Sequence, residues 1–256
     1  TGHYARVDRD GPRLLTAVDR AKDQTYFLHR IEAGVLGRTR FPVGGLTKPE
    51  VRRIARQEGL PVHDKRDSTG ICFIGERPFR EFLATHLPAQ PGDIVDECGR
   101  VLGRHAGLAS YTIGQRQGLG LGGRRDAADA PWYVADKDIH SNRLVVVQGA
   151  DHPALMSTGL DAVEAHWIAD PPPALPMVCH ARIRHRQRAV RCRVRAAGDG
   201  LAVDFDTPQR AVAPGQYVVF YLDDYCLGGA VIDRARALRR RDLLKALKGA
   251  KALLGE

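Results

Sequence analysis

The feature that most constrains the fold is a series of short alternating runs in the last third of the chain. Six runs between residues 157 and 233 alternate apolar with polar residues, at 162–167, 177–187, 191–195, 201–205, 216–221 and 226–232. This period places every second side chain on one face of a strand. Six such strands bury one face together most readily by closing into a barrel. We therefore expect a C-terminal β-barrel over residues 156–233.

Two further kinds of pattern precede the barrel. Residues 78–155 contain short strand runs separated by Gly and Pro turns, which predicts a small central β-rich module. Residues 1–77 look like α/β material, because Thr47 and Glu50 have capping-box spacing and helical periodicity follows until Gly59. That pattern predicts a helix of about three turns.

Two short segments need separate interpretation. The glycine run at 118–123 has neither a strand before it nor a helix after it, so it predicts a loop and not a dinucleotide-binding turn. Residues 234–256 repeat leucine and alanine at helical spacing, and we expect a basic amphipathic helical tail there.

The positive charge is concentrated in two places. The chain carries 39 Lys and Arg against 30 Asp and Glu, a net charge of +9. Residues 234–256 contribute eight cations and two acids, so +6 of the surplus lies in the tail. Seven arginines and no acid fall within residues 182–195. An extended strand would place Arg182, Arg184, Arg186 and Arg188 on one face. Either a phosphate backbone or acids on neighbouring strands, such as Asp204 and Asp206, would offset their repulsion.

Five cysteines without a C-x-x-C pair disfavour a structural zinc site and a disulfide framework. We expect no metal site. No apolar run approaches the roughly 20 residues that span a bilayer, so we expect no membrane partner and a cytoplasmic protein. Cys72 lies between Gly70 and Gly75, with Lys65 and Arg66 nearby to favour a thiolate. The alternative is a buried structural cysteine.

Five motifs occur in a fixed order along the chain: TGHYAR at 1–6, KDQTYFL at 22–28, STGICFIG at 68–75, YTIGQRQGLG at 111–120 and CLGGAVI at 226–232. Together they resemble the bacterial tRNA 2-thiouridylases. The resemblance covers residues 1 to about 233. It implies a chain of α/β and β structure, with four parts. These are the C-terminal part of an adenine-nucleotide α-hydrolase-like (PP-loop ATP pyrophosphatase) domain at 1–77, a tRNA-binding β-rich module at 78–155, a β-barrel at 156–233 and the tail at 234–256.

The resemblance also implies a reaction, the ATP-dependent 2-thiolation of the wobble uridine of tRNA. ATP, with Mg²⁺, adenylates the C2 oxygen, and a cysteine persulfide on Cys72 supplies the sulfur. Gly2 matches a position that contacts ATP. The positions matching tRNA contacts are Lys22, Asp23, Gln24, Arg184 and His185. The implied partners are tRNA and a sulfur-relay donor protein, not DNA.

Residues 22–24 also have a simpler reading, in which Asp23 caps a helix and Lys22 is a surface charge. The sequence departs from the family pattern at three points. It contains neither the family's phosphate loop nor the first catalytic cysteine, which forms a disulfide with the second. His185 stands where the family often has tyrosine. We therefore expect this chain alone to be inactive in thiolation. Two alternatives are a non-catalytic tRNA-binding fragment and an unrelated thiol-dependent sulfur carrier.

Overall fold

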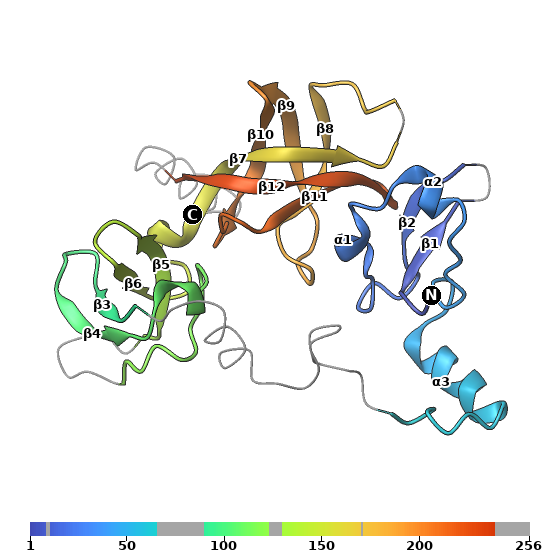
Figure 1. Cartoon of the computed structure of the whole chain (residues 1–256), viewed down its shortest axis with the longest axis horizontal. Helices are drawn as coiled ribbons and strands as arrows, with labels where there is room; N and C mark the ends of the chain where they lie inside the picture. Colours follow the sequence, from blue (N-terminus) through green and yellow to red (C-terminus); the bar gives the residue numbers. More distant parts are fainter. Residues whose placement is uncertain (9–10, 66–89, 123–129, 170, 239–256) are drawn as a thin grey trace, which may run out of the picture. The chain divides into compact units, whose positions relative to one another are not determined.

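The structure, a computed structural model, describes residues 1–8, 11–65, 90–122, 130–169 and 171–238 (Figure 1). The chain divides into two compact units. The first unit contains residues 1–67, 159–207 and 214–235, and the second contains residues 68–158, 208–213 and 236–256. In the described part of the chain, no helix is long and apolar enough to cross a membrane.

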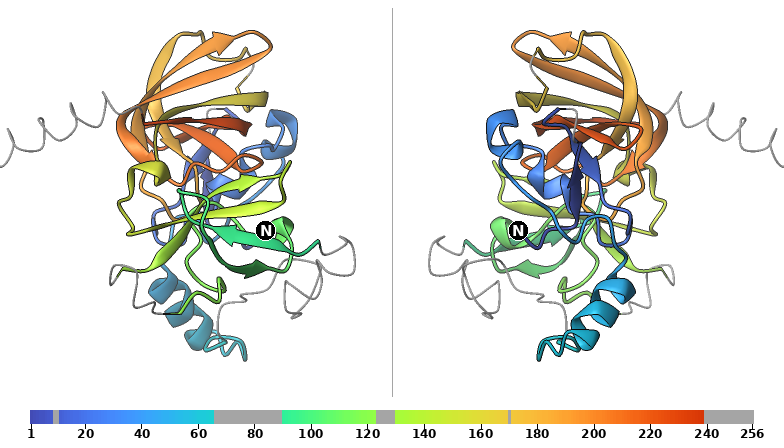
Figure 2. Two further views of the ribbon diagram at one scale, coloured as in Figure 1. Left: turned by 90° about the vertical axis from the view of Figure 1, so that its left-hand side faces the viewer. Right: turned by 90° about the vertical axis from the view of Figure 1, so that its right-hand side faces the viewer.

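Six strands form the closed barrel that the alternating runs predict. They are β7 (Met156–Trp167), β8 (Met177–Arg182), β9 (Val190–Ala197), β10 (Gly200–Arg210), β11 (Tyr217–Leu222) and β12 (Tyr225–Ala237). They pair in the order β12-β11-β8-β9-β10-β7, and β7 pairs back onto β12 (Figures 1 and 2). The barrel prediction is confirmed.

The second barrel strand is shorter than its pattern predicts. β8 ends at Arg182, and a turn occupies the following residues. The side-chain oxygen of Gln187 accepts a hydrogen bond from the Ile183 N–H at 3.1 Å, and the Gln187 N–H donates to the Arg184 carbonyl at 3.1 Å. These local bonds replace the strand ladder. The four alternating arginines therefore do not share one strand face.

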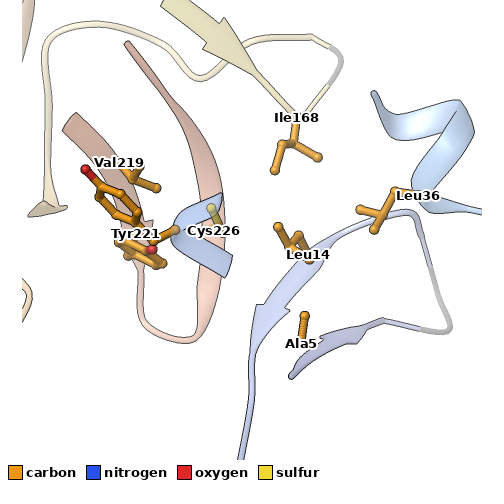
Figure 3. Packing of buried hydrophobic residues seen from close by; sticks show 8 residues of the cluster. Ala5, Leu14, Leu36, Ile168, Val219, Tyr221 and Cys226 are labelled. Atoms are coloured by element: carbon orange, nitrogen blue, oxygen red, sulfur yellow. The ribbon is translucent and has the colours of Figure 1, made fainter. Parts of the chain in front are cut away.

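The N-terminal segment joins the same sheet. Strands β1 (Ala5–Val7) and β2 (Leu14–Thr16) form an antiparallel pair, and Leu14 and Leu15 of β2 pair with β12. Leu14, Ile168 and Cys226 point into one apolar core (Figure 3). Because residues from both ends of the sequence fill this core, the N-terminal segment and the barrel are packed together.

The described part of this segment contains three helices: α1 (Thr25–Leu28), α2 (Ala33–Leu36) and α3 (Lys48–Gln57). α3 confirms the helix predicted from the capping-box spacing. The carboxylate of Glu50 accepts hydrogen bonds from the backbone N–H and the hydroxyl of Thr47, both at 2.7 Å. None of the ten residues of α3 is buried. Because most helices are stabilised chiefly by packing of a buried face, the capping hydrogen bonds at Thr47 and Glu50 contribute a larger share of the stability of α3.

The second unit contains a four-stranded sheet in the order β4-β3-β6-β5. Its strands are β3 (Gly92–Val95), β4 (Val101–His105), β5 (Trp132–Asp138) and β6 (Arg143–Gln148). The unit also contains two short 3₁₀ helices, η1 (Leu108–Ser110) and η2 (Pro153–Leu155). The described part of the glycine run lies in an irregular segment anchored by buried Leu119, with positive φ at Gly118 and Gly120. This confirms the predicted loop.

The helical pattern expected after residue 233 does not begin there. β12 continues to Ala237, and Arg234 on it pairs with Asp161 of β7 at 2.7 Å. Residues 239–256, which contain the rest of the predicted tail helix, lie outside the described residues.

Candidate nucleic-acid interface

A polar groove of about 1010 Å³ lies in the first unit, where three distant segments meet. Its lining includes five cationic side chains, three carboxylates and two histidines, contributed by residues 16–23, 180–189 and 221–224. Arg20 pairs with Asp224, and Arg182 pairs with Asp23. Among the described residues, no ion pair engages Arg186 or Arg188, and both are exposed. The groove therefore presents positive charge to solvent.

Asp23 forms part of the floor of this groove, with its side chain only 1% exposed. One carboxylate oxygen accepts from the Ala17 N–H at 3.0 Å. The other accepts from the Thr25 hydroxyl at 2.9 Å and from Arg182 Nη1 at 2.7 Å. Asp23 does not cap α1, whose N-cap residue is Gln24. Its carboxylate instead fixes the position of Arg182.

Arg182 is held on two sides. Its side chain is 13% exposed, and its guanidinium lies over the Tyr221 ring, 4.7 Å from the ring centroid. Such stacking is favourable for a guanidinium. Burial raises the pKa of Tyr221, so its hydroxyl stays protonated. A buried guanidinium needs a partner carboxylate, and Asp23 supplies it from 159 residues away in the sequence.

His185 forms an aromatic pair at the groove. Its Nε2 lies 2.9 Å from the backbone carbonyl of Asp23, and since a carbonyl only accepts, Nε2 carries the hydrogen. The His185 ring centroid is 4.4 Å from that of Phe27, and Phe27 is 59% exposed. Sequence reasoning missed Phe27, because an apolar residue in a short helix ordinarily indicates core. Its place inside the motif at 22–28 is the one signal that marks it.

Comparisons with known proteins match this chain along most of its length. The model described as "tRNA methyl transferase HUP domain" matches residues 1–76. That of the "tRNA methyl transferase PRC-barrel domain" matches 80–148, and that of the "Aminomethyltransferase beta-barrel domain" matches 157–232. A tRNA-specific 2-thiouridylase MnmA from Alcanivorax borkumensis is 57% identical over 235 residues, which are 91% of this chain. The chain belongs to the tRNA-specific 2-thiouridylase family.

Other members of this 2-thiouridylase family are similar to this chain to nearly the same degree. The MnmA proteins of Hahella chejuensis and Marinobacter nauticus are 55% and 53% identical, each over 91% of this chain. The matched part is 65% of the Alcanivorax and Hahella proteins and 61% of the Marinobacter protein. The chain thus spans less than two thirds of the length of these relatives.

The structure brings together some of the site residues that the family resemblance implies. Lys22, Asp23 and His185 line the groove. Gln24 lies beside it in the sequence, and its side-chain oxygen accepts from the Tyr4 N–H at 2.9 Å. Arg184 is exposed on the turn after β8 and is not among the lining residues.

Two other site residues that the family resemblance implies are not among the described residues that line the groove: Gly2 lies apart from it, and Cys72 lies outside the described residues. Gly2 is exposed, and a Cβ built on it would meet no atom within 4 Å. The roles of Gly2 and Cys72, and the tRNA contacts of the groove residues, stay predictions.

The remaining arginines of the cluster have a different environment. On β9, Arg191 pairs with Asp206 at 2.6 Å, and Arg195 lies 3.7 Å from Asp204. The neighbouring strand β10 therefore offsets much of their charge, which is the second of the two arrangements that the sequence left open. The arginine cluster divides into a balanced strand and a turn that faces the groove.

The described cysteines are free thiols. Cys179 and Cys192 face each other across β8 and β9, with their sulfurs 3.8 Å apart. Their mutual hydrogen bond and burial raise the pKa of Cys192, and burial raises the pKa of Cys226 to about 12. The thiols of Cys192 and Cys226 therefore stay protonated, which makes them poor nucleophiles. Within the described segments, no three His, Cys, Asp or Glu side chains converge on a metal position.

Proposed function

We propose that this chain binds tRNA and carries sulfur for the 2-thiolation of the wobble uridine. One observation supports the proposal most strongly: Lys22 and Asp23 from one segment that matches the family's tRNA contacts, and His185 from the other, line one cationic groove. The groove fits a phosphate backbone, because exposed arginines and a lysine neutralise phosphates and position the nucleic acid.

The aromatic pair suits RNA in particular. Unstacked bases of single-stranded loops are commonly stacked on aromatic side chains. Phe27 and His185 offer such a surface beside cationic side chains, and the wobble base lies in a single-stranded loop. Phosphate contacts in the groove and stacking at this pair together support the binding of an anticodon loop.

The proposed chemistry assigns the sulfur to Cys72. The terminal persulfide sulfur attacks C2 of the uridine, and the C2 oxygen leaves as part of AMP. Another cysteine thiol then attacks the Cys72 sulfur, so that the S–S bond breaks, the transferred sulfur stays on C2 and the two cysteines form a disulfide. ATP, with Mg²⁺, supplies the activation of the C2 oxygen when bound. A Cβ built at Gly2 would meet no atom within 4 Å, so this side of the backbone leaves room for a nucleotide. A sulfur-relay protein charges Cys72, and a cytoplasmic location follows from these partners.

A binding measurement tests the RNA part of this proposal. We expect Arg186→Gln combined with Arg188→Gln to weaken tRNA binding by the full chain. The slope of log affinity against log salt should fall by about 0.7 to 0.9 for each phosphate that the double variant no longer neutralises. Arg191→Gln combined with Arg195→Gln removes the same charge from the balanced strand β9 and serves as the matched control. Equal slopes for the two double variants would contradict the groove assignment.

Activity assays separate the enzyme from the non-catalytic alternative. The complete gene product should form 2-thiouridine in tRNA, and Cys72→Ser should abolish it. Wild-type thiolation in that variant would exclude Cys72 as the carrier. The alternative, a tRNA-binding fragment without chemistry, predicts tRNA binding with no release of pyrophosphate from ATP.

A further inference from the structure

A second basic hollow of about 550 Å³ lies in the first unit, between the turn at 19–22 and helix α3. Its lining residues are Asp19, Lys22, Lys48, Pro49, Arg52, Arg53 and Arg56. Five cations thus face one carboxylate. None of the family motifs in the sequence covers the α3 residues, and the tRNA contacts proposed above do not include them.

The one acid of this hollow is engaged with backbone groups. The carboxylate of Asp19 accepts hydrogen bonds from the Lys48 N–H at 2.9 Å and from the Ala21 N–H at 3.1 Å. Its role is to fix the start of α3 to the 19–22 turn. The hollow keeps a large excess of positive charge after this acid is counted.

The arginines of α3 have weak or neutral partners. Arg53 donates to the side-chain oxygen of Gln57 at 2.7 Å, and Arg52 donates to the Lys65 carbonyl at 3.3 Å. Arg56 lies 3.4 Å from Asp64, with both side chains more than half exposed, and such surface pairs contribute little. Strong anion contacts at these guanidinium groups are therefore available to a ligand.

The spacing of these cations follows one face of the helix. Lys48, Arg52 and Arg56 are four residues apart, so they lie one above another along α3 over about 12 Å. Like charges at this spacing destabilise a helix unless an anion lies between them. A row of this length fits successive phosphates of a polynucleotide better than a single compact anion.

Lys22 connects the two hollows, because it lines both of them. The cationic groove at the β8–β9 turn thus continues past Lys22 onto α3 within one compact unit. We propose that the basic face of α3 binds backbone phosphates of the same tRNA that occupies the groove. This inference rests on the proposed function, and it extends the RNA path to residues that no motif marks.

The test uses the full chain and the double variant Arg53→Gln/Arg56→Gln, since both side chains are exposed and line the hollow. We expect tRNA affinity at 0.1 M salt to fall on the order of tenfold, and the salt slope to fall by about one to two. The β9 double variant Arg191→Gln/Arg195→Gln removes the same charge and should retain nearly all of the affinity.

Three outcomes would distinguish the assignments. If the α3 variant behaves like the β9 control while Arg186→Gln/Arg188→Gln weakens binding, the α3 inference fails and the proposed function stands. If neither the groove variant nor the α3 variant weakens binding, the proposed function fails as well. If millimolar ATP displaces tRNA from the wild-type chain, and Arg53→Gln/Arg56→Gln abolishes ATP binding, the hollow is a nucleotide site. That result would overturn the RNA assignment.

Discussion

The ion pair between Asp23 and Arg182 organises the groove at the scale of single residues. A buried pair of this kind is costly to form, and it is far more costly to leave half-complete. Its two members contact the 16–25 segment and the end of β8, respectively. The pair therefore couples the stability of the first unit to the shape of its groove.

We predict that Asp23→Asn lowers the free energy of unfolding by about 3 kcal/mol, because it leaves the Arg182 charge buried without its counter-ion. Urea denaturation of the wild-type chain and the variant measures this change. Arg191→Gln breaks an exposed pair and should cost less than about 1 kcal/mol. Equal costs for the two variants would show that the Asp23 pair is not structurally important.

His29 predicts a pH dependence of stability. Its Nδ1–H donates to the Tyr26 carbonyl at 2.8 Å, and its buried Nε2 has no hydrogen-bond partner among the described residues. Burial lowers the pKa of His29 below its ordinary value of 6.5. The unfolded chain therefore takes up a proton more readily than the folded chain. The stability held above pH 6.5 is lost as pH falls through 6.5 toward the lower folded pKa.

Denaturation at pH values from 7.5 to 5.5 measures this loss. We expect His29→Asn to flatten the curve, because asparagine keeps a donor for the Tyr26 carbonyl and cannot titrate. A wild-type slope that persists unchanged in the variant would assign the proton uptake to other groups.

Helix α3 illustrates stability at the scale of an element. Its contacts at Thr47 and Glu50 carry unusual weight, since none of its residues is buried. We predict that Thr47→Ala reduces the hydrogen-exchange protection of the α3 amides about fivefold.

The same capping box gives α3 a dependence on pH. Hydrogen bonds from Thr47 lower the pKa of Glu50 below 4.5. The stabilisation from this capping box is therefore complete above pH 4.5 and disappears as pH falls through the lower folded pKa. Unchanged hydrogen-exchange protection of the α3 amides in Thr47→Ala would contradict the stabilising role of this capping box.

The sequence predicted elements better than it predicted their ends and partners. Period-two patterning identified the six barrel strands, because burial of one face imposes that pattern directly. It did not predict the end of β8, since the side chain of Gln187 closes the turn there. It also gave no sign that β2 pairs with β12, because that pairing joins residues about 210 positions apart. The domain boundaries at 77, 155 and 233 stay predictions.

The candidate site was predictable only in part, for a similar reason. The family resemblance identified Lys22, Asp23 and His185, but three separate segments have to fold before these residues share a groove. The repeated arginines suggested a phosphate contact without showing which of them β10 neutralises. Period and charge are local properties, whereas the groove depends on tertiary contacts.

The whole molecule presents more charge than the groove contains. Residues 239–256 carry six cations and two acids, a net +4. We predict that truncation after Leu238 weakens binding to any RNA at low salt and reduces the salt slope. The weakening caused by Arg186→Gln/Arg188→Gln should persist in the truncated chain, since charge in a tail attracts polyanions without selecting among them. Filter binding with tRNA and with an unrelated RNA measures both effects. A loss of affinity confined to tRNA would instead make the tail part of the specific site.

The separation of Asp23 and Arg182 in the sequence also determines when their ion pair can form during synthesis of the chain. Ribosomes add about 5 to 20 residues per second, so the 159 residues between these partners take about 8 to 32 s to synthesise. During that interval, the Asp23 carboxylate lacks its cation, and β2 lacks the strand that completes its edge. The groove forms only after its last lining segment, residues 221–224, has been synthesised. The order of synthesis thus delays assembly of the groove until the described fold is nearly complete.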